Sequence, residues 1–410
     1  MVITGLGCVT ALGESVEQVF GSLCEGRSGV STIESFDASA YPVHIAGEIK
    51  AFEIDKYVDR RESKRMDRFT QLAVAAAIQA MKDSGLDLSK EDPYRVGVIV
   101  GTGIGEIGEI EAQYLKLLDK GPSKVSPFCV PRLMANAACG NIAIQYGLRG
   151  PNFCVSSACA SGNHAIGEAF CNIAHGRSDV QITGGSEAAC TPIGLASFCA
   201  ARSLSTRNDN PQAASRPFDK DRDGFVLAEG AGIMILEEYE HAKRRGARIY
   251  AELLGYGATD DGYHITAPLP DGTGAAKAME FALADAGLTP DRVDYINAHG
   301  TGTELNDVAE TAAIKSVFGP HAYKLAISST KSCLGHMLGA TAAVELIVCV
   351  MAINEGIIPP TVNLENIDPL CDPKLNFTPL KAERRKVNIA ISNSLGFGGH
   401  NSCVVVGKLL

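Results

Sequence analysis

Residues 155–169 read VSSACASGNHAIGEA and place one cysteine, Cys159, between two different patterns. An apolar, strand-like run precedes it, and a helix-like run follows as far as about His175, where Gly176 ends the helix. We therefore expect Cys159 at a helix N-terminus, where the helix dipole and free N–H groups favour a thiolate and lower the pKa of the thiol. Its small neighbours leave room for a substrate carbonyl and an oxyanion. A packed core cysteine would show the same local pattern, so other motifs must decide.

Strand-like and helix-like segments alternate along the chain, which indicates α/β architecture. Residues 75–103 contain AAAIQAMKDSGL and VGVIVGTG, and residues 277–302 repeat this order as KAMEFALADAGL and VDYINAHGTG. This internal repeat predicts duplicated α/β halves, residues 1–248 and 249–410, joined through the charged segment that begins at Leu236. We expect a site where equivalent loops of the two halves meet.

Composition excludes some classes of function. The net charge of −10 argues against general nucleic-acid binding, because no basic excess is available to displace counterions. The longest apolar run begins at Ala342, contains Glu345 and covers about a dozen residues, which predicts a buried helix and no membrane insertion. The N-terminal residues read as a strand and a turn, not as a leader, so we expect a cytoplasmic protein, or one in an organelle stroma or matrix after removal of a transit peptide.

The thirteen cysteines show no CxxC spacing and no zinc-type pairing with histidine, so we expect no metal. Their odd number favours a reducing compartment. The segment GTGIGEIG contains Gly103, Gly105 and Gly108 at the spacing of a dinucleotide fingerprint. No strand with a ribose-binding acid follows at the required distance, so we expect no nucleotide cofactor.

Two further motifs carry histidines after predicted strands. In NAHGTGTELND, His299 follows a strand, and Thr301 and Thr303 offer hydroxyl groups suited to the amides of an extended ligand. In STKSCLGHMLGATAA, His336 stands at the entrance to a helix, five residues after Lys331. Each histidine alone is compatible with a core or capping role. A thiol and two histidines at equivalent strand ends instead indicate acyl transfer.

A carboxylate inside an apolar helix needs a partner, and Glu345 is in that position. Lys331 is the natural cation for it, while Asp307 and Glu310 either join the same network or are solvated. The segment NSLGFGGHNS predicts a hairpin turn with Phe397 at its tip, where an aromatic ring should have something to cover.

In combination, SACASGNHAIG, NAHGTGT, TKSCLGHMLGA and NSLGFGGHN resemble the β-ketoacyl-[acyl-carrier-protein] synthases of the thiolase-like superfamily, over essentially the whole chain. Two histidines, instead of histidine plus asparagine, are typical of the elongating type, and the synthase II branch is the most similar. The resemblance implies thiolase-like halves in a layered αβαβα arrangement and a homodimer. It also implies condensation of an acyl-enzyme with malonyl-acyl-carrier protein in fatty-acid elongation, giving 3-oxoacyl-carrier protein and CO2.

The resemblance assigns roles to the reacting groups. Cys159 is implied as the nucleophile that accepts the acyl chain. His299 and His336 are implied to hold the malonyl thioester carbonyl and to stabilise the enolate. The backbone N–H groups of Cys159 and Phe397 are implied as the oxyanion hole, with Phe397 also gating the entry of malonyl.

Other residues are implied in supporting roles. Lys331, paired with Glu345, is implied to tune the histidines, and Thr301 and Thr303 to contact the 4'-phosphopantetheine arm of the carrier. The protein itself is implied to need no cofactor, although the sequence leaves open a monovalent cation near Glu345. Solvated charge is the default interpretation of the basic segments. The resemblance instead implies a docking surface for the acyl carrier protein formed by Arg61, Lys64, Arg65 and Arg202.

The sequence departs from the family's usual motifs at two positions, and three other functions compete with the condensing enzyme. Leu395 stands where the family usually has phenylalanine, and Gly302 replaces a frequent serine. A polyketide-type ketosynthase would use the same motifs. A non-catalytic chain-length-factor-like subunit should lack the cysteine and the histidines. A CoA-dependent thiolase would need a second cysteine near the C-terminal glycine-rich loop, but Cys403 falls within the following strand.

Overall fold

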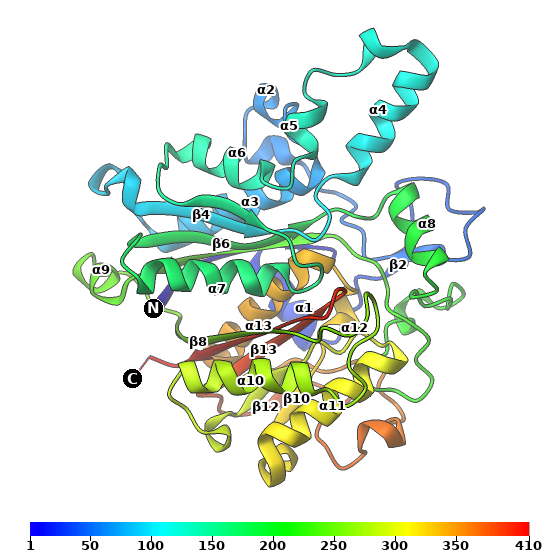
Figure 1. Ribbon diagram of the computed structural model, residues 1–410, viewed down its shortest axis with the longest axis vertical. Coiled ribbons are helices and arrows are strands. Elements are labelled where there is room, and N and C mark those ends of the chain that lie inside the picture. The colour runs from blue at the N-terminus through cyan, green and yellow to red at the C-terminus, as the bar shows by residue number, and fades with distance from the viewer. Residues whose placement is uncertain (410) are drawn as a thin grey trace.

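The computed structural model describes residues 1–409 (Figure 1). Its main sheet has ten strands: β1 (Val2–Thr10), β4 (Val96–Gly101), β5 (Asn152–Val155), β6 (Val180–Glu187), β7 (Gly230–Glu237), β8 (Ala251–Asp260), β9 (Tyr295–Asn297), β10 (Ala326–Ser328), β13 (Ile389–Gly396) and β14 (His400–Gly407). Two small two-stranded sheets pair β2 (Ser31–Thr32) with β3 (Ile45–Ala46) and β11 (Ile357–Ile358) with β12 (Glu383–Arg384).

The helices surround and separate the strands. They are α1 (Val16–Cys24), α2 (Arg60–Ser63), α3 (Arg68–Ser84), α4 (Ile107–Lys120), α5 (Cys129–Leu133), α6 (Ala137–Tyr146), α7 (Ser161–Ala174), α8 (Pro192–Ala200), α9 (Tyr239–Arg244), α10 (Thr273–Asp285), α11 (Glu304–Phe318), α12 (Lys331–Leu334) and α13 (Thr341–Glu355).

The strand order repeats the same pattern twice. It runs β10-β9-β13-β14-β8-β1-β7-β6-β4-β5, so each half has three parallel strands followed by two antiparallel ones. The halves meet where β1 pairs with β8, through Val2 with Glu252 and Ile3 with Ala251. The charged helix α9 connects β7 to β8 in the chain. The exact boundary at residue 248 stays a prediction.

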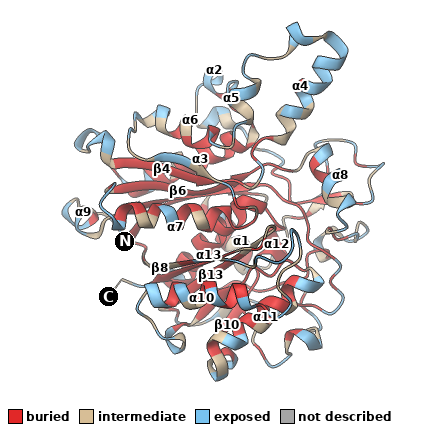
Figure 2. Ribbon diagram, in the orientation of Figure 1, coloured by how far each residue is buried: buried red, intermediate tan, exposed pale blue. Residues whose placement is uncertain are grey.

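The elements form five layers, as the predicted αβαβα arrangement requires (Figure 1). Helices α7 and α13 lie between the two halves of the sheet, and each contacts strands of both. Helix α3 covers the outer face of one half, and α10 covers that of the other, packed against α11. Figure 2 shows the sheet and the two central helices as mostly buried, and much of α4 as exposed.

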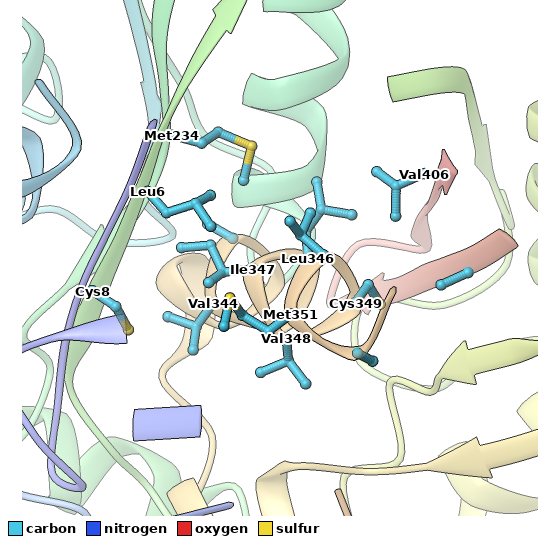
Figure 3. Close-up of a cluster of buried hydrophobic side chains, with 14 of the residues drawn as sticks. Leu6, Cys8, Met234, Val344, Leu346, Ile347, Val348, Cys349, Met351 and Val406 are labelled. Atoms are coloured by element: carbon cyan, nitrogen blue, oxygen red, sulfur yellow. The ribbon is translucent and has the colours of Figure 1, made fainter. Parts of the chain in front are cut away.

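Helix α13 is the centre of the core because it is apolar on every side. All its residues from 341 to 353 are buried. Side chains of β1, β7 and β14 lie around it, among them Leu6, Met234 and Val406 (Figure 3). The apolar helical stretch Leu338–Glu355 is 18 residues long, longer than the run read from the sequence, and by length and composition it could cross a membrane. Because 83% of it is buried inside the protein, we interpret it as a core helix, as predicted.

Helix α9 is fixed to the N-terminal half by buried charges. His241 lies between two carboxylates, with Nδ1 2.8 Å from Glu237 Oε2 and Nε2 2.9 Å from Glu91 Oε2. Burial lowers the pKa of the imidazole, but Glu91 and Glu237 outweigh it, so the pKa of His241 is raised.

Candidate active site

Cys159 lies in the turn between β5, which ends at Val155, and α7, which begins at Ser161. The preceding Ala158 has a φ of 50°, a left-handed conformation that is strained for a residue with a Cβ atom. The turn is held from both ends, because Ser161 Oγ donates to the Ala158 carbonyl (2.6 Å) and Ser394 Oγ to the Cys159 carbonyl (2.8 Å). The sequence located this turn correctly but gave no sign of its strain.

The sulfur of Cys159 is enclosed by groups from both halves of the chain. Its Sγ lies 3.0 Å from His336 Nε2. One ligand-type atom from each of Cys159, His299 and His336 lies within 4.8 Å of the others. The two imidazole rings stand edge to face, with their centroids 5.4 Å apart. The backbone N–H groups of Phe397 and of Cys159 itself both lower the pKa of the thiol.

The expectation of a lowered pKa for Cys159 is wrong. Burial raises the pKa of the thiol to about 12. The charge of Lys331 and the N–H group of Phe397 favour the thiolate, but they compensate for only part of the lost hydration. At neutral pH the thiol of Cys159 is therefore protonated.

Both active-site histidines are neutral. Burial and the nearby charge of Lys331 hold the pKa values of His299 and His336 well below the usual range. His336 Nδ1 lies 3.0 Å from Thr341 Oγ1, which leaves Nε2 facing the sulfur. Since a hydroxyl can donate or accept, Thr341 is compatible with either tautomer of His336. The sequence did not single out Thr341, whose position in α13 looked like that of an ordinary core residue.

A buried carboxylate on α11 holds the loop that carries His299. The backbone N–H groups of His299 and Gly300 each donate to Glu310, at 2.8 Å. Asp307 is also buried, with its Oδ2 3.5 Å from Arg222 Nε. Solvation was therefore the wrong alternative for both acids, because each is buried. Glu310 does share a network with Lys331 and Glu345. Burial raises the pKa of Glu310 and the charge of Lys331 acts to lower it, while the charge of Glu310 helps to raise the pKa of Glu345. Asp307 instead pairs with Arg222.

The structure brings Lys331 and Glu345 together. Lys331 Nζ lies 2.7 Å from Glu345 Oε1, and both side chains are almost completely buried. Burial raises the pKa of Glu345 to about 7, although the charge of Lys331 acts in the opposite direction. This pair places one cation next to the cysteine and the histidines.

A cavity of about 550 Å³ leads to Cys159 and is lined by both halves of the chain. The predicted hairpin of β13 and β14 is present, and its turn places Leu395 and Phe397 on the cavity wall. Thr301 and Thr303 also line it, with their Oγ1 atoms 2.9 Å apart. Figure 1 shows the turn between β13 and β14 near α12, which begins with Lys331.

The predicted docking residues fall into two places. Arg202 is exposed and lines the cavity. Arg61, Lys64 and Arg65 are exposed on and just after α2 and do not line it. Helix α2 lies beside α5, where Arg132 Nη2 donates to the Lys64 carbonyl (Figure 1). Of the four basic residues, only Arg202 lines the cavity.

Sequence reasoning also missed Glu187, which ties the two halves together behind the site. It accepts hydrogen bonds from Thr102 Oγ1 (2.8 Å), from the N–H of Gly103 (2.6 Å) and from the N–H of Gly339 (3.0 Å). Thr102 and Gly103 follow β4, whereas Gly339 precedes α13. The available signal was a glutamate at the end of the buried strand ITGGSE, a costly place for an unpaired carboxylate.

Comparisons with known proteins agree with this geometry. Residues 1–242 match the family model "Beta-ketoacyl synthase, N-terminal domain", and residues 250–365 match "Beta-ketoacyl synthase, C-terminal domain". Two curated relatives are named 3-oxoacyl-[acyl-carrier-protein] synthase 2. The protein from Synechocystis sp. is 52% identical over 408 residues, and that from Coxiella burnetii is 49% identical over 409. Each alignment covers 100% of this chain and 98% of the relative.

Solved structures show the same fold. A β-ketoacyl synthase from Burkholderia phymatum has a TM-score of 0.92 and 35% identity, covering 100% of this chain and 99% of that one. A type II polyketide ketosynthase, solved in complex with its acyl-carrier protein, gives a TM-score of 0.92 and 36% identity with the same coverage. The fold, the converging cysteine and histidines, and both family models lead to one conclusion: this chain belongs to the β-ketoacyl synthase family.

Proposed function

We propose that the protein elongates fatty acids by condensing an acyl group held on Cys159 with malonyl-acyl-carrier protein. The observation that carries this proposal is the meeting of Cys159, His299 and His336, within 4.8 Å, at the end of one cavity. The names of the curated relatives, at 46–52% identity, support the elongating reaction and its carrier-bound substrates.

The first half-reaction transfers the acyl chain. The sulfur of Cys159 attacks the thioester carbonyl, and the oxygen becomes an oxyanion next to the N–H groups of Cys159 and Phe397. Collapse releases the carrier thiol. Since His336 Nε2 lies 3.0 Å from the sulfur, it can pass the proton of Cys159 to the departing thiolate, so that no net charge remains. This relay suits a thiol whose pKa is about 12.

The second half-reaction forms the new carbon–carbon bond. Malonyl-carrier loses CO2, and the electrons of the broken bond become an enolate on the thioester oxygen. His299 and His336 donate N–H hydrogen bonds to that oxygen as neutral imidazoles, so they stabilise its charge without readily protonating the carbon. In this step His336 carries its proton on Nε2 and Thr341 donates to Nδ1, whereas in the first half-reaction Nε2 is the acceptor and Nδ1 carries the proton. The Thr341 hydroxyl fits both forms. The enolate carbon attacks the acyl-Cys159 carbonyl, and collapse of the tetrahedral intermediate releases 3-oxoacyl-carrier and breaks the bond to the sulfur of Cys159. The sulfur leaves as a thiolate and takes one proton, which comes from solvent by way of His336, to restore the resting thiol.

Lys331 is proposed as an electrostatic support for these steps. Its charge is the strongest pKa-lowering influence on Cys159, and it also disfavours imidazolium at His299 and His336. Burial with Glu345 keeps that charge away from solvent screening. Lys331 therefore helps the histidines stay neutral donors.

An acyl carrier protein is the proposed partner. Its pantetheine arm would reach Cys159 past Thr301, Thr303 and the gate residue Phe397, all of which line the cavity. Arg61, Lys64, Arg65 and Arg202 are proposed to contact the acidic carrier. We expect Lys64→Glu with Arg65→Glu to slow turnover on carrier substrates and to leave the rate on free acyl-pantetheine unchanged. If the variant turned over carrier substrates as fast as the parent does, the proposed docking surface would be wrong.

A homodimer is proposed from an exposed apolar surface around α4, α5 and β5. Ile110, Tyr114 and Leu118 of α4 are between 51% and 67% exposed, and Val130 of α5 is 61% exposed. Strand β5 is also an outer strand of the ten-stranded sheet. Light scattering should give the mass of two chains, and Leu118→Glu should shift it toward one.

A monovalent cation near Glu345 remains a proposal. Among residues 1–409, Glu345 Oε2, Asn297 Oδ1 and Ser392 Oγ are buried without a hydrogen-bond partner. Asn297 and Ser392 are neighbours on paired strands, and Asn297 Nδ2 reaches the Glu345 carbonyl at 3.4 Å. These oxygens fit a hard cation. A higher melting temperature in K⁺ or Na⁺ than in a bulky organic cation at equal ionic strength would support it.

We also propose a reducing, cytoplasmic setting, which suits thirteen free cysteines.

Intact mass spectrometry with an acyl-carrier substrate tests the proposal. One acyl adduct should form on the parent protein and on Cys199→Ala, and none on Cys159→Ala. Malonyl-carrier should then remove the adduct and give 3-oxoacyl-carrier. Acylation by acyl-CoA alone would instead indicate a thiolase or an initiating synthase, and no adduct from either donor would favour the chain-length-factor alternative. Multiply extended products would identify a polyketide ketosynthase.

A further inference from the structure

We propose that Cys159, His299 and His336 form a binding site for a soft divalent cation, Zn²⁺ above all, which blocks the protein reversibly. One ligand-type atom from each residue already lies within 4.8 Å of the others, and His336 Nε2 is 3.0 Å from Cys159 Sγ. With metal–ligand bonds of about 2.0–2.3 Å, ligand atoms in a tetrahedral site lie about 3.3–3.8 Å apart. Small side-chain rotations are therefore enough to close this set around an ion.

The donor atoms select the metal. Two imidazole nitrogens and one thiolate are ligands that Zn²⁺ and Co²⁺ prefer, whereas Mg²⁺ and Ca²⁺ prefer oxygen. Three protein ligands leave a fourth tetrahedral position for water, on the side of the cavity. The cavity also provides the entry path, because all three residues line it.

The two histidines are held in place before any metal arrives. His336 Nδ1 is hydrogen-bonded to Thr341 Oγ1, which leaves Nε2 as the available nitrogen. The loop of His299 is fixed by Glu310, through the N–H groups of His299 and Gly300. The bond at His336 Nδ1 is an outer hydrogen bond to the ligating ring, of the kind that contributes about 10–100-fold to metal affinity. At His299 only the backbone is fixed, because Nδ1 of its ring has no hydrogen-bond partner among residues 1–409. The site therefore needs little reorganisation to bind.

The surrounding charges compensate a dication. Glu187 lies near Cys159, Glu310 lies next to His299, and Glu345 lies beside Lys331. All three carboxyl groups are completely buried, and burial raises the pKa of each, so a bound dication would favour their ionised forms and be compensated by them. A buried dication bound to one thiolate would carry one excess positive charge, and this environment favours it.

The binding step is an exchange of cation for proton. Cys159 loses its thiol proton to solvent, and the sulfur electron pair forms the bond to Zn²⁺. A metal-bound sulfur cannot attack a thioester, and an acylated Cys159 has no thiolate to offer. Zn²⁺ and the acyl group therefore exclude each other. The block of condensation rests on the proposed function, but the binding itself does not.

Cobalt gives a direct readout of the site. Titration of the full-length protein with CoCl2 should produce a thiolate-to-cobalt charge-transfer band and the intense visible bands of a tetrahedral ion, saturating at one equivalent. Zn²⁺ should remove these bands, and Mg²⁺ should not. Cys199→Ala should keep them, because this thiol has no histidine partners in the metal-ligand cluster. Cys159→Ala should abolish them, and His299→Gln should weaken binding by more than about 100-fold.

Prior acylation provides a test that does not depend on how the variants fold. The parent protein, with no residue substituted, should lose the cobalt bands when Cys159 is acylated, and hydrolysis of the thioester should restore them. Bands that persist after acylation or in Cys159→Ala would overturn the metal site, as would their absence from the free protein. If the protein accepts an acyl group from the carrier but shows no cobalt bands before acylation, the metal site alone is refuted. Cobalt bands without an adduct would refute the proposed function alone.

Discussion

The buried pair of Lys331 and Glu345 gives the sharpest prediction, because replacing Glu345 should cost more stability than replacing Lys331. Their charged atoms are 2.7 Å apart, and 1% and 0% of the two side chains are exposed. Glu345→Leu leaves an ammonium group buried without its partner. Removing one member of a buried ion pair costs about 3–5 kcal/mol, and we expect that loss of stability here.

Lys331→Met should cost less, about 1–3 kcal/mol. With Lys331 present, burial has already raised the pKa of Glu345 to about 7, and without Lys331 the pKa rises further. The carboxyl group can then take up a proton and avoid an unpaired charge. Because this pKa lies above that of the unfolded chain, the stability of the variant should fall as the pH rises from 5 to 8.

Urea unfolding followed by circular dichroism, at several pH values, measures both effects. The double variant Lys331→Met/Glu345→Leu should regain most of the lost stability, because neither charge remains. It should not regain condensation, since the cation that favours the Cys159 thiolate is missing. Equal losses for the two single variants, or activity that returns together with stability, would refute this reasoning.

Three further predictions concern other parts of the molecule. Gly339→Ala should destabilise the fold by about 1–3 kcal/mol in urea titrations, because the added Cβ would lie 2.3 Å from the Gly103 backbone nitrogen. His241→Gln should lower the melting temperature at pH 6 more than at pH 9, since the raised pKa of His241 contributes stability that is lost as the pH rises through the folded value. Thr341→Val removes the hydrogen-bond partner of His336 Nδ1 and should slow malonyl decarboxylation by about 5–100-fold in single-turnover assays, with rescue by Thr341→Ser. An unchanged decarboxylation rate would show that the hydrogen bond from Thr341 does not support His336 as a donor in this step.

Much of the fold could be predicted from the sequence, because its signals are local. The turn at Cys159, the helix that follows it and the hairpin that carries Phe397 are present where the pattern placed them. The repeated helix-strand order predicted two similar halves, and the sheet has the same strand pattern twice. Each of these features depends on residues only a few positions apart.

The site could be predicted only in part, because its energetics depend on contacts across the chain. Glu187 and Thr341 gave almost no local signal, and their roles come from hydrogen bonds formed after folding. Glu310 looked like an acid that could be solvated, yet it is buried against the His299 loop. Glu187 meets Gly339 across 152 positions of the chain, and the nearer contacts of Thr341 and Glu310 depend on how the loops fold, which residue spacing does not show.

The sequence by itself determined which residues to expect at the candidate site, and these residues do lie together: a cysteine before a helix, two histidines after strands and a lysine to match a buried glutamate. The tertiary structure alone decided their state. The helix N-terminus at Cys159 suggested a thiolate, but burial raises the pKa of the thiol to about 12. The reason is physical: a helix dipole acts through a few neighbouring residues, whereas desolvation depends on every atom that folding brings around the sulfur.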